Sequence, residues 1–205
     1  MIQVFRPSLG EEELEGLREI FKTGWIGLGP KTAEFEEKFA EYVCAKYAVG
    51  LNSATAALHL SLAAFRIGPD HEVLVSPLTF VSTAHAILYV GATPVFVDVC
   101  PDTLCMDPDD VERKLTDKSR VILPVHYGGH PAELDELQKI ARKHNLLLIE
   151  DAAHACGSEY KGRKIGSIGD ATCFSFHAVK NLATGDGGMI TTDRLDVCRT
   201  LRRLR

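Results

Sequence analysis

The stretch at 121–150, VILPVHYGGHPAELDELQKIARKHNLLLIE, contains an apolar run, an amphipathic segment and a second apolar run. The runs at 121–125 and 146–150 are too short for helices and are apolar on both faces, as strands between two helix layers must be. A strand, a helix and a strand in this order predict two parallel strands joined by a crossover helix. The apolar residues of the central segment recur at helical spacing: Leu134, Leu137 and Ala141.

The same alternation extends over most of the chain, where five further short apolar runs predict strands. Thr184–Gly188, between the last two runs, is turn material with no room for a crossover helix, so the last strand is expected to be antiparallel. The sequence therefore predicts an α/β fold with a mostly parallel sheet of about seven strands, one antiparallel strand and helices on both faces. The five runs are YAVGL at 47–51, VLVS at 73–76, VFVDV at 95–99, CFSF at 173–176 and MITT at 189–192.

Helices are also predicted outside this alternating region. Two precede the first strand, near 10–22 and 31–45, and are joined by a rigid connector at Gly24–Pro30. The chain is expected to divide into an N-terminal helical segment at 1–45 and a main domain at 46–205. A further helix follows the last strand, and its arginines are expected to form a solvated face: Arg199, Arg202, Arg203 and Arg205.

The composition, with 45% hydrophobic and 25% charged residues, is typical of a globular protein with one sizeable core. The net charge of −5 leaves no basic excess to neutralise a phosphate backbone, so nucleic-acid binding is not expected. The N-terminal residues lack the pattern of a secretory signal, and no segment has about 18 consecutive apolar residues. We therefore expect a cytoplasmic protein that does not associate with membranes.

The six cysteines lie within apolar or helical stretches at irregular spacings, and none forms a C-x-x-C pair. This pattern favours reduced core residues over disulfides or a metal site. No metal is expected. The six are Cys44, Cys100, Cys105, Cys156, Cys173 and Cys198.

Four predicted strand ends carry residues suited to chemistry, because the ligands of such sheets gather where parallel strands end and helices begin. The first, at 52–57, places Ala54 and Thr55 at a helix start, which suits a phosphate, although serine and threonine are also common as plain N-caps. The second, at 76–83, places Phe80 in the first turn of the next helix. Its ring could lie against a flat ligand there, and a core phenylalanine is the alternative.

The other two strand ends carry charged residues. Asp151 follows a buried strand, where a carboxylate is costly unless a cation or a strong donor meets it. His154, three residues on, is expected on the same side of a helical turn. Lys180 follows the strand that contains Ser175, and in a dry site its lowered pKa would make it a competent amine nucleophile. A core histidine and a solvated lysine are the alternatives.

Together the four strand ends offer a phosphate cradle, a platform for a flat ring, a buried acid and an amine. These are the parts that a protein supplies to pyridoxal 5′-phosphate (PLP) and its amine form (PMP). The acid keeps the pyridine nitrogen protonated, and the lysine holds and releases the aldehyde. Each signal is weak alone, but their combination predicts a PLP site.

The same segments resemble the DegT/StrS-type sugar aminotransferases, a PLP-dependent family with the fold-type-I architecture. The resemblance covers nearly the whole chain, and its last two segments are highly specific. It implies an incomplete PLP-binding large domain, with the C-terminal small domain of the longer family members absent. The matching segments are GWIGLGPKTAEFEEKFAEY at 24–42, LNSATAALHLSL at 51–62, SPLTFVSTAHAILYVGATPVFVDV at 76–99, LPVHYGG at 123–129, IEDAAHACGSEYKGRKIGSIGD at 149–170 and FSFHAVKNLATGDGGMITTD at 174–193.

Position by position, the resemblance implies roles for the candidate residues. Lys180 would be the Schiff-base lysine and move the proton in the reaction, and Asp151 would pair with the pyridine nitrogen. Phe80 would stack on the ring, and His154 would lie close to its phenolic side. The phosphate would be bound by the backbone of Ala54 and Thr55 and by the hydroxyl of Ser175.

The resemblance also implies a reaction: transfer of an amino group, with glutamate as the expected donor, to a nucleotide-linked keto-sugar in cell-surface polysaccharide or amino-sugar biosynthesis. EDAAHA and FSFHAVKN are most similar to the branch that acts on UDP-4-keto-pyranoses. A homodimer is expected, with Trp25 and Ile26 of the connector as candidate contacts. Two alternatives stay open. One is a sugar dehydratase of the same family, against which Lys180 argues because those relatives replace the lysine; the other is an inert fragment that dimerises or regulates.

Overall fold

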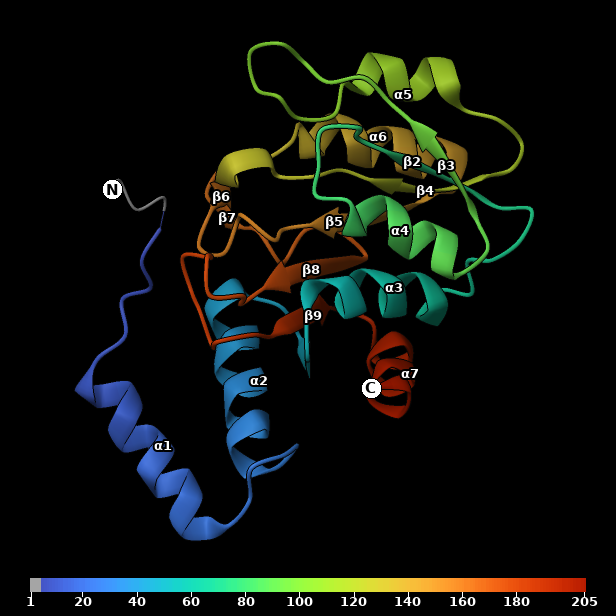
Figure 1. Ribbon diagram of the computed structural model, residues 1–205. Helices are drawn as coiled ribbons and strands as arrows, with labels where there is room; N and C mark the ends of the chain where they lie inside the picture. The colour runs from blue at the N-terminus through green and yellow to red at the C-terminus, as the bar shows by residue number, and fades with distance from the viewer. Residues whose placement is uncertain (1–4) are drawn as a thin grey trace.

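Seven strands form one sheet that supports the fold. The computed structural model describes residues 5–205, and its strand order is β1-β9-β8-β5-β4-β2-β3 (Figure 1). Every pairing in this sheet is parallel except the two made by β9, which confirms the predicted antiparallel strand. The strands are β1 (Tyr47–Leu51), β2 (Glu72–Val75), β3 (Thr93–Phe96), β4 (Ser119–Leu123), β5 (Leu147–Asp151), β8 (Ala171–Ser175) and β9 (Gly188–Thr192).

Helices cover both faces of the sheet, as predicted, and each face has its own hydrophobic core. One core joins the sheet to α2, α5 and α6, and includes Phe39 and Leu137. The other joins it to α3, α4 and α7, and includes Leu62 and Leu201. The helices are α2 (Pro30–Val43), α3 (Ala54–Ala64), α4 (Ser82–Tyr89), α5 (Pro108–Lys114), α6 (Leu134–His144) and α7 (Leu195–Leu204).

The strand–helix–strand unit predicted at 121–150 is present. β4 and β5 pair in parallel, with Val121 opposite Leu147, and α6 connects them. Leu134 and Leu137 of α6 are fully buried against the sheet, so the helical spacing of apolar residues identified the packed face. The connection brings the carboxyl ends of both strands to one edge of the sheet.

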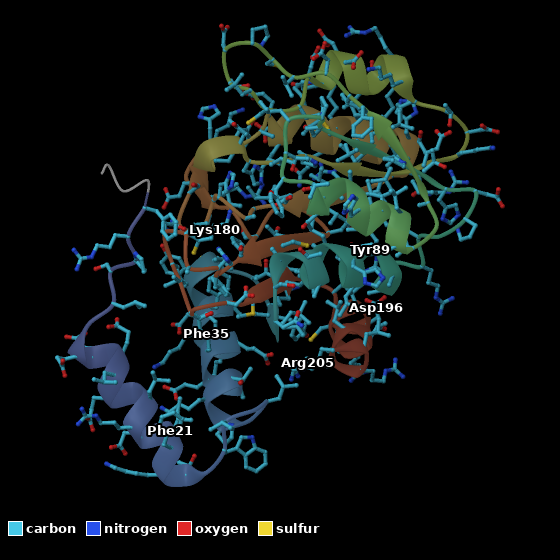
Figure 2. The ribbon with its side chains drawn as sticks, viewed as in Figure 1. Phe21, Phe35, Tyr89, Lys180, Asp196 and Arg205 are labelled. Atoms are coloured by element: carbon cyan, nitrogen blue, oxygen red, sulfur yellow. The ribbon has the colours of Figure 1, made fainter. Side chains whose placement is uncertain are left out.

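The first helix differs from the others because it buries none of its residues. α1 (Glu11–Thr23) stands apart from the sheet, and its Phe21 projects into solvent (Figures 1 and 2). The connector after it begins at Gly24, whose φ of 69° suits glycine, and the Trp25 indole donates a hydrogen bond to the Leu28 carbonyl. In the described part of the chain no helix is long and apolar enough to cross a membrane.

Several expectations need correction. β3 begins at Thr93 and ends at Phe96, because the chain then turns and Val99 pairs with Met106 instead. The sequence patterns also missed four short elements, too short for periodicity to detect. They are α5, the 3₁₀ helix η1 (Tyr127–Gly129) and the hairpin strands β6 (Glu159–Tyr160) and β7 (Arg163–Lys164).

The four arginines at 199–205 are exposed, as predicted, but two of them also pair with a buried carboxylate. Arg202 and Arg205 pair with Glu36 of α2, a buried carboxylate that also accepts a hydrogen bond from the Gly50 N–H at 2.7 Å. A buried carboxylate needs such partners, and this one ties α7 to α2 and β1.

The prediction that the cysteines are core residues is correct for three of the six and wrong for Cys44, whereas Cys100 and Cys156 are only partly buried. All six thiols are free, and Cys105, Cys173 and Cys198 are buried in the cores. Cys44 is exposed because it forms the left-handed C-cap of α2, with φ of 59°, where the chain leaves the helix.

Candidate active site

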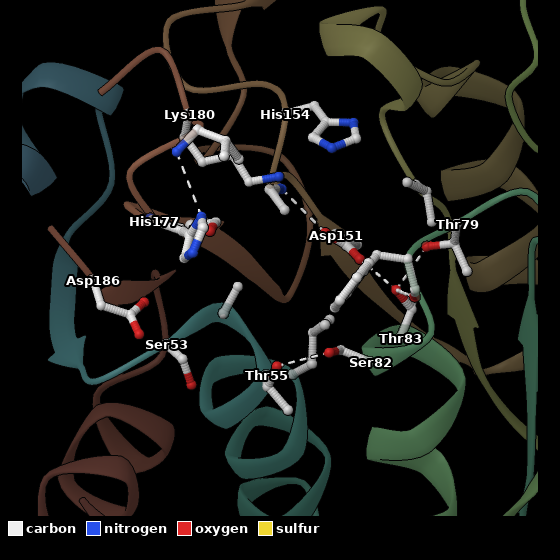
Figure 3. A pocket seen from close by; sticks show the side chains of 17 residues that line it. Ser53, Thr55, Thr79, Ser82, Thr83, Asp151, His154, His177, Lys180 and Asp186 are labelled. Atoms are coloured by element: carbon white, nitrogen blue, oxygen red, sulfur yellow. Dashed lines mark hydrogen bonds between the residues drawn. The ribbon is translucent and has the colours of Figure 1, made fainter. Parts of the chain in front are cut away.

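All the predicted site residues lie around one cavity of about 340 Å³ (Figure 3). Its walls come from the ends of β1, β2, β4, β5 and β8 and the segments that follow them, because parallel strands end at the same edge of a sheet. The predicted residues come from four of these. Four strand ends that are far apart in the sequence are therefore neighbours in space. The predicted residues among the lining are Ala54, Thr55, Phe80, Asp151, His154, Ser175 and Lys180.

Asp151 ends β5 and lies in the cavity wall with only 3% of its surface exposed. Its Oδ1 accepts a hydrogen bond from the Ala153 N–H at 3.0 Å, and its Oδ2 accepts one from the Thr83 hydroxyl at 2.7 Å. The strong donors predicted for this buried acid are thus present. Since both oxygens accept, the arrangement suits an ionised carboxylate whose remaining lone pairs can receive a donor from the cavity.

Lys180 is half-buried in the loop after β8 and is the only lysine among residues 5–205 that lines the cavity. Burial lowers the pKa of its amine, and the nearby Asp151 carboxylate opposes this shift. A lowered pKa enlarges the neutral fraction of the amine, and the neutral form is the one that attacks a carbonyl carbon.

His154 lies across the cavity from Ser53 and Thr55 (Figure 3). Its ring stays accessible from the cavity, but partial burial lowers the pKa of the imidazole. The positive charge of Lys180 lowers this pKa further, whereas the negative charge of Asp151 raises it. The Gly128 N–H points at Nδ1 from 3.4 Å, so the neutral ring carries its proton on Nε2. His154 can therefore offer an N–H donor to a ligand.

The local structure around His154 and Phe80 differs from the prediction. Residues 152–158 form turns rather than a helical turn, because the β6–β7 hairpin begins at Glu159 and Gly157 has a φ of 89°. Phe80 precedes α4, which begins at Ser82, and is 72% exposed at the cavity rim rather than packed in a first helical turn. Both side chains still reach the cavity.

The other end of the cavity combines hydroxyls with the first turn of α3. The Ser53 side chain caps the helix by accepting from the Ala56 N–H at 3.2 Å, and the Thr55 hydroxyl donates to Ser82 at 2.7 Å. Free N–H groups at a helix start and several hydroxyls favour an anion such as phosphate. Ser175, at the end of β8, completes this hydroxyl group.

Gly188 of β9 makes this end of the cavity possible. A Cβ atom at this position would lie 2.3 Å from the Ser53 carbonyl oxygen and 2.8 Å from the Ala54 nitrogen. Only a glycine allows the strand to approach the start of α3 so closely.

Some lining residues were missed by the sequence reasoning. Ser82 and Thr83 could have been predicted, because they are hydroxyl residues at the start of a helix that follows a strand, as Ser53 is. For the others, only the folded chain brings them to the cavity. They are Thr79, Val179, His177 and Asp186.

Glu150, next to Asp151, points to the opposite face of β5 and is fully buried. Its oxygens accept from the Gly169 N–H at 2.7 Å, from the Thr172 hydroxyl at 2.8 Å and from His126 Nε2 at 2.9 Å. Because His126 Nδ1 accepts from the Ala132 N–H, its Nε2 must carry the proton and donate. Glu150 therefore joins β5 to β8 and to the segment after β4, directly behind the cavity.

These features fit the parts of PLP. The helix start and hydroxyls suit the phosphate, the Asp151 carboxylate suits a pyridine N–H, and the Lys180 amine suits the aldehyde. Within residues 5–205, no group of three or more histidine, cysteine or acidic side chains could hold a metal ion.

Comparisons with known proteins point to one family of aminotransferases. The chain is 50% identical over 198 residues to the spore coat polysaccharide biosynthesis protein SpsC of Bacillus subtilis, covering 97% of this chain and 51% of SpsC. Its fold matches the PLP form of Spr1654 of Streptococcus pneumoniae, assigned as a sugar aminotransferase, with a TM-score of 0.95, 38% identity, and coverage of 99% of this chain and 57% of that one.

A third relative is PseC of Helicobacter pylori, an aminotransferase of pseudoaminic acid biosynthesis, with a TM-score of 0.92 and 31% identity over 98% of this chain and 54% of that one. The chain thus spans about half the length of the relatives it matches. The profile of the DegT/DnrJ/EryC1/StrS aminotransferase family matches residues 7–205. With nearly the whole chain matched and the cavity formed by the segments that carry the resemblance, this chain belongs to the DegT/DnrJ/EryC1/StrS aminotransferase family.

Proposed function

We propose that this chain is the cofactor-binding part of a PLP-dependent aminotransferase that transfers an amino group to a nucleotide-linked keto-sugar. The observation that carries the proposal is that the Lys180 amine and the Asp151 carboxylate share one cavity with the start of α3. An amine of lowered pKa, a buried acid and an anion-binding end are needed together for this cofactor and for few others.

When bound, PLP supplies an aldehyde that condenses with amines and a ring that withdraws electrons. Each protein group then has a part that follows from its position. Lys180 Nζ would hold the cofactor's aldehyde and would carry the proton that moves during transfer. Asp151 keeps the ring nitrogen protonated. Phe80 covers the ring from the rim, and His154 offers its Nε2 proton to the ring's phenolic oxygen.

At the anion-binding end, the backbone around Ala54 and Thr55 and the hydroxyl of Ser175 are proposed to hold the phosphate. The first turn of α3 contributes N–H groups that no carbonyl of its own helix can accept from. A phosphate held there would leave the rest of the cofactor to the part of the cavity that Phe80, Asp151 and Lys180 line.

The substrate class is proposed from the relatives. SpsC is named for the biosynthesis of a polysaccharide, and PseC is an aminotransferase of pseudoaminic acid biosynthesis. Both names support a sugar acceptor, and we propose a UDP-linked 4-keto-pyranose with glutamate as amino donor. We place the reaction in the cytoplasm, in a pathway that builds cell-surface polysaccharide or amino sugars.

We also propose that the protein acts as a homodimer. The connector residues Trp25 and Ile26 are 59% and 77% exposed, and α1 buries none of its residues. Large apolar side chains on a segment with a fixed backbone are common anchors of protein interfaces.

The test is covalent capture of PLP on a defined lysine. PLP is added to the purified chain, the visible spectrum is recorded, and borohydride reduction followed by peptide mass spectrometry locates the modification. We expect a visible band and a reduced adduct on Lys180, both lost in Lys180→Ala and retained in Lys161→Ala, whose lysine lies outside the cavity. No band at saturating PLP would refute the proposal and favour an inert role.

A further inference from the structure

Thr83 is a cavity-lining residue to which the proposed function gives no part. It is fully buried in the first turn of α4. Its Oγ1 lies 2.7 Å from Asp151 Oδ2, 2.7 Å from Thr79 Oγ1 and 3.0 Å from the Phe80 carbonyl oxygen (Figure 3). A hydroxyl has one proton, so Thr83 can donate to only one of these three oxygens. Thr79 is itself a hydroxyl and can be the donor of its pair, which leaves two groups that can only accept, the carboxylate and the carbonyl.

The direction of these bonds follows from their chemistry. A hydrogen bond to a carboxylate is charge-assisted and shorter than a neutral one, and the contact with Asp151 is the shorter of the two. Thr83 therefore donates to Asp151. Because its only proton is then used, the short contact with Thr79 requires that Thr79 donates to Thr83. The result is a directed chain of hydroxyls, Thr79 to Thr83 to Asp151.

This chain restrains the Asp151 carboxylate. The Ala153 N–H holds Oδ1 and the Thr83 hydroxyl holds Oδ2, so each oxygen has its own donor from a different segment. With both oxygens held, the carboxylate plane cannot rotate without breaking a bond. Its unused lone pairs keep one orientation toward the cavity, which is preorganisation for a single incoming N–H group.

We propose that Thr83 is a positioning residue: its hydroxyl, oriented by Thr79, holds the Asp151 carboxylate in the orientation that receives the pyridine nitrogen of PLP. The inference rests on the proposed function, since it concerns the same cofactor. Thr83 acts through Asp151 and does not touch the reacting atoms.

The first test measures cofactor binding. PLP is titrated into wild-type chain, Thr83→Val, Thr83→Ser and Thr191→Val, followed by the visible band. Thr191 is the matched control, a fully buried threonine whose hydroxyl donates to the Gly166 carbonyl at 2.8 Å outside the cavity. Thr83→Val keeps the shape of the side chain but removes its hydroxyl. We expect the Kd for PLP to rise about tenfold and the visible band to shift, because one charge-assisted hydrogen bond to Asp151 is lost.

Thr83→Ser should restore both the Kd and the position of the band, because it keeps the hydroxyl, and Thr191→Val should bind like wild type. A general loss of packing would affect Thr83→Ser and the control as well. Equal binding by Thr83→Val and wild type would overturn the inference.

The second test needs no cofactor and separates this inference from the proposed function. The free energy of unfolding is measured for Thr83→Val, Asp151→Ala and the double variant, with Thr191→Val and Asp151→Ala as the control cycle. Coupled residues give non-additive changes, and distant ones give additive changes. Additivity for Thr83 and Asp151 would overturn the inference even if PLP binds. If wild type does not bind PLP, the proposed function is refuted. The coupling energy between Thr83 and Asp151 then still decides whether Thr83 holds the Asp151 carboxylate.

Discussion

At the scale of single residues, Lys180 and Lys161 show how the fold sets the reactivity of one side-chain type. Burial lowers the pKa of Lys180, whereas a hydrogen bond to the Asp135 carboxylate raises the pKa of Lys161 well above its usual range. At any pH below both values, the neutral fraction of Lys180 is the larger. We expect pulse acetylation to modify Lys180 faster than Lys161, with its labelling midpoint at lower pH.

Peptide mass spectrometry across about pH 7 to pH 11 gives the labelling midpoint of Lys180, whereas labelling of Lys161 should still be rising at the upper limit of this range. Since the Asp151 charge opposes the downward shift, Asp151→Ala should move the Lys180 midpoint to still lower pH and leave Lys161 unchanged. Coincident midpoints for the two lysines would contradict a dry amine in the cavity.

Glu150 gives a second prediction at this scale, because every neighbour of its carboxylate is a donor. In Glu150→Gln, the amide NH₂ must face either the Gly169 N–H or the proton of His126 Nε2, whichever way the amide is turned. The His126 ring cannot move its proton, since its other nitrogen accepts from a backbone N–H. We expect a loss of about 3 kcal/mol in the free energy of unfolding, the cost of clashing buried donors.

Chemical denaturation measures this loss, and Glu159→Gln is the control. Glu159 is exposed and pairs with Lys164 at the surface, so its substitution should change the free energy of unfolding by less than about 0.5 kcal/mol. Equal stability of Glu150→Gln and wild type would contradict the role given to the donors around Glu150.

At the scale of elements, the contact between β9 and the start of α3 decides the shape of the anion-binding end. Gly188→Ala would place a methyl group within 2.3 Å of the Ser53 carbonyl oxygen, so α3 must shift away from the strand. Overpacking of this kind costs about 1–3 kcal/mol, and the shift also moves the N–H groups of the first helical turn. We expect lower stability together with weaker PLP binding.

Gly16→Ala on α1 is the matched control, because a Cβ there meets no atom within 4 Å and the residue is helical. It should keep PLP binding and be as stable as wild type or slightly more stable. A Gly188→Ala chain that binds PLP normally would contradict the role given to this contact.

The strands and their parallel arrangement could be predicted because their signal is local. Apolar runs such as 121–125 and turn residues such as Thr184–Gly188 determine strand, crossover and direction within a few residues. The pairing of Arg205 with Glu36, or of His126 with Glu150, joins positions far apart in the chain and leaves no periodic pattern. Such contacts, like the exposed position of Phe80, depend on packing that only the folded chain defines.

At the scale of the whole molecule, the sheet separates structural and chemical work. Its two faces hold the two hydrophobic cores, and the carboxyl edge of its parallel strands holds the cavity. Stability and chemistry therefore draw on different side chains of the same strand, as Glu150 and Asp151 of β5 illustrate. Because of this separation, the residues that line the cavity can differ in chemistry while the hydrophobic residues on the two faces of the sheet keep the same packing.

The last prediction concerns self-association through α1. Its apolar residues Leu14, Leu17 and Phe21 lie three, four and seven positions apart and so share one face, yet they are 41%, 48% and 67% exposed. A helix of 13 residues that buries nothing is marginal on its own, so a second copy of the chain that covers this face would stabilise it. We expect a dimer by light scattering coupled to size-exclusion chromatography.

The double variant Leu17→Glu, Phe21→Glu should shift the protein toward a monomer, because two charges cannot be buried in an apolar contact. Glu19→Arg, which changes charge on the opposite face of the same helix, two positions from Leu17 and from Phe21, is the control and should remain dimeric. Circular dichroism shows whether the sheet and its helices persist, which they should, since α1 contributes nothing to either core. A wild-type chain that stays monomeric at high concentration with PLP bound would rule out this mode of assembly.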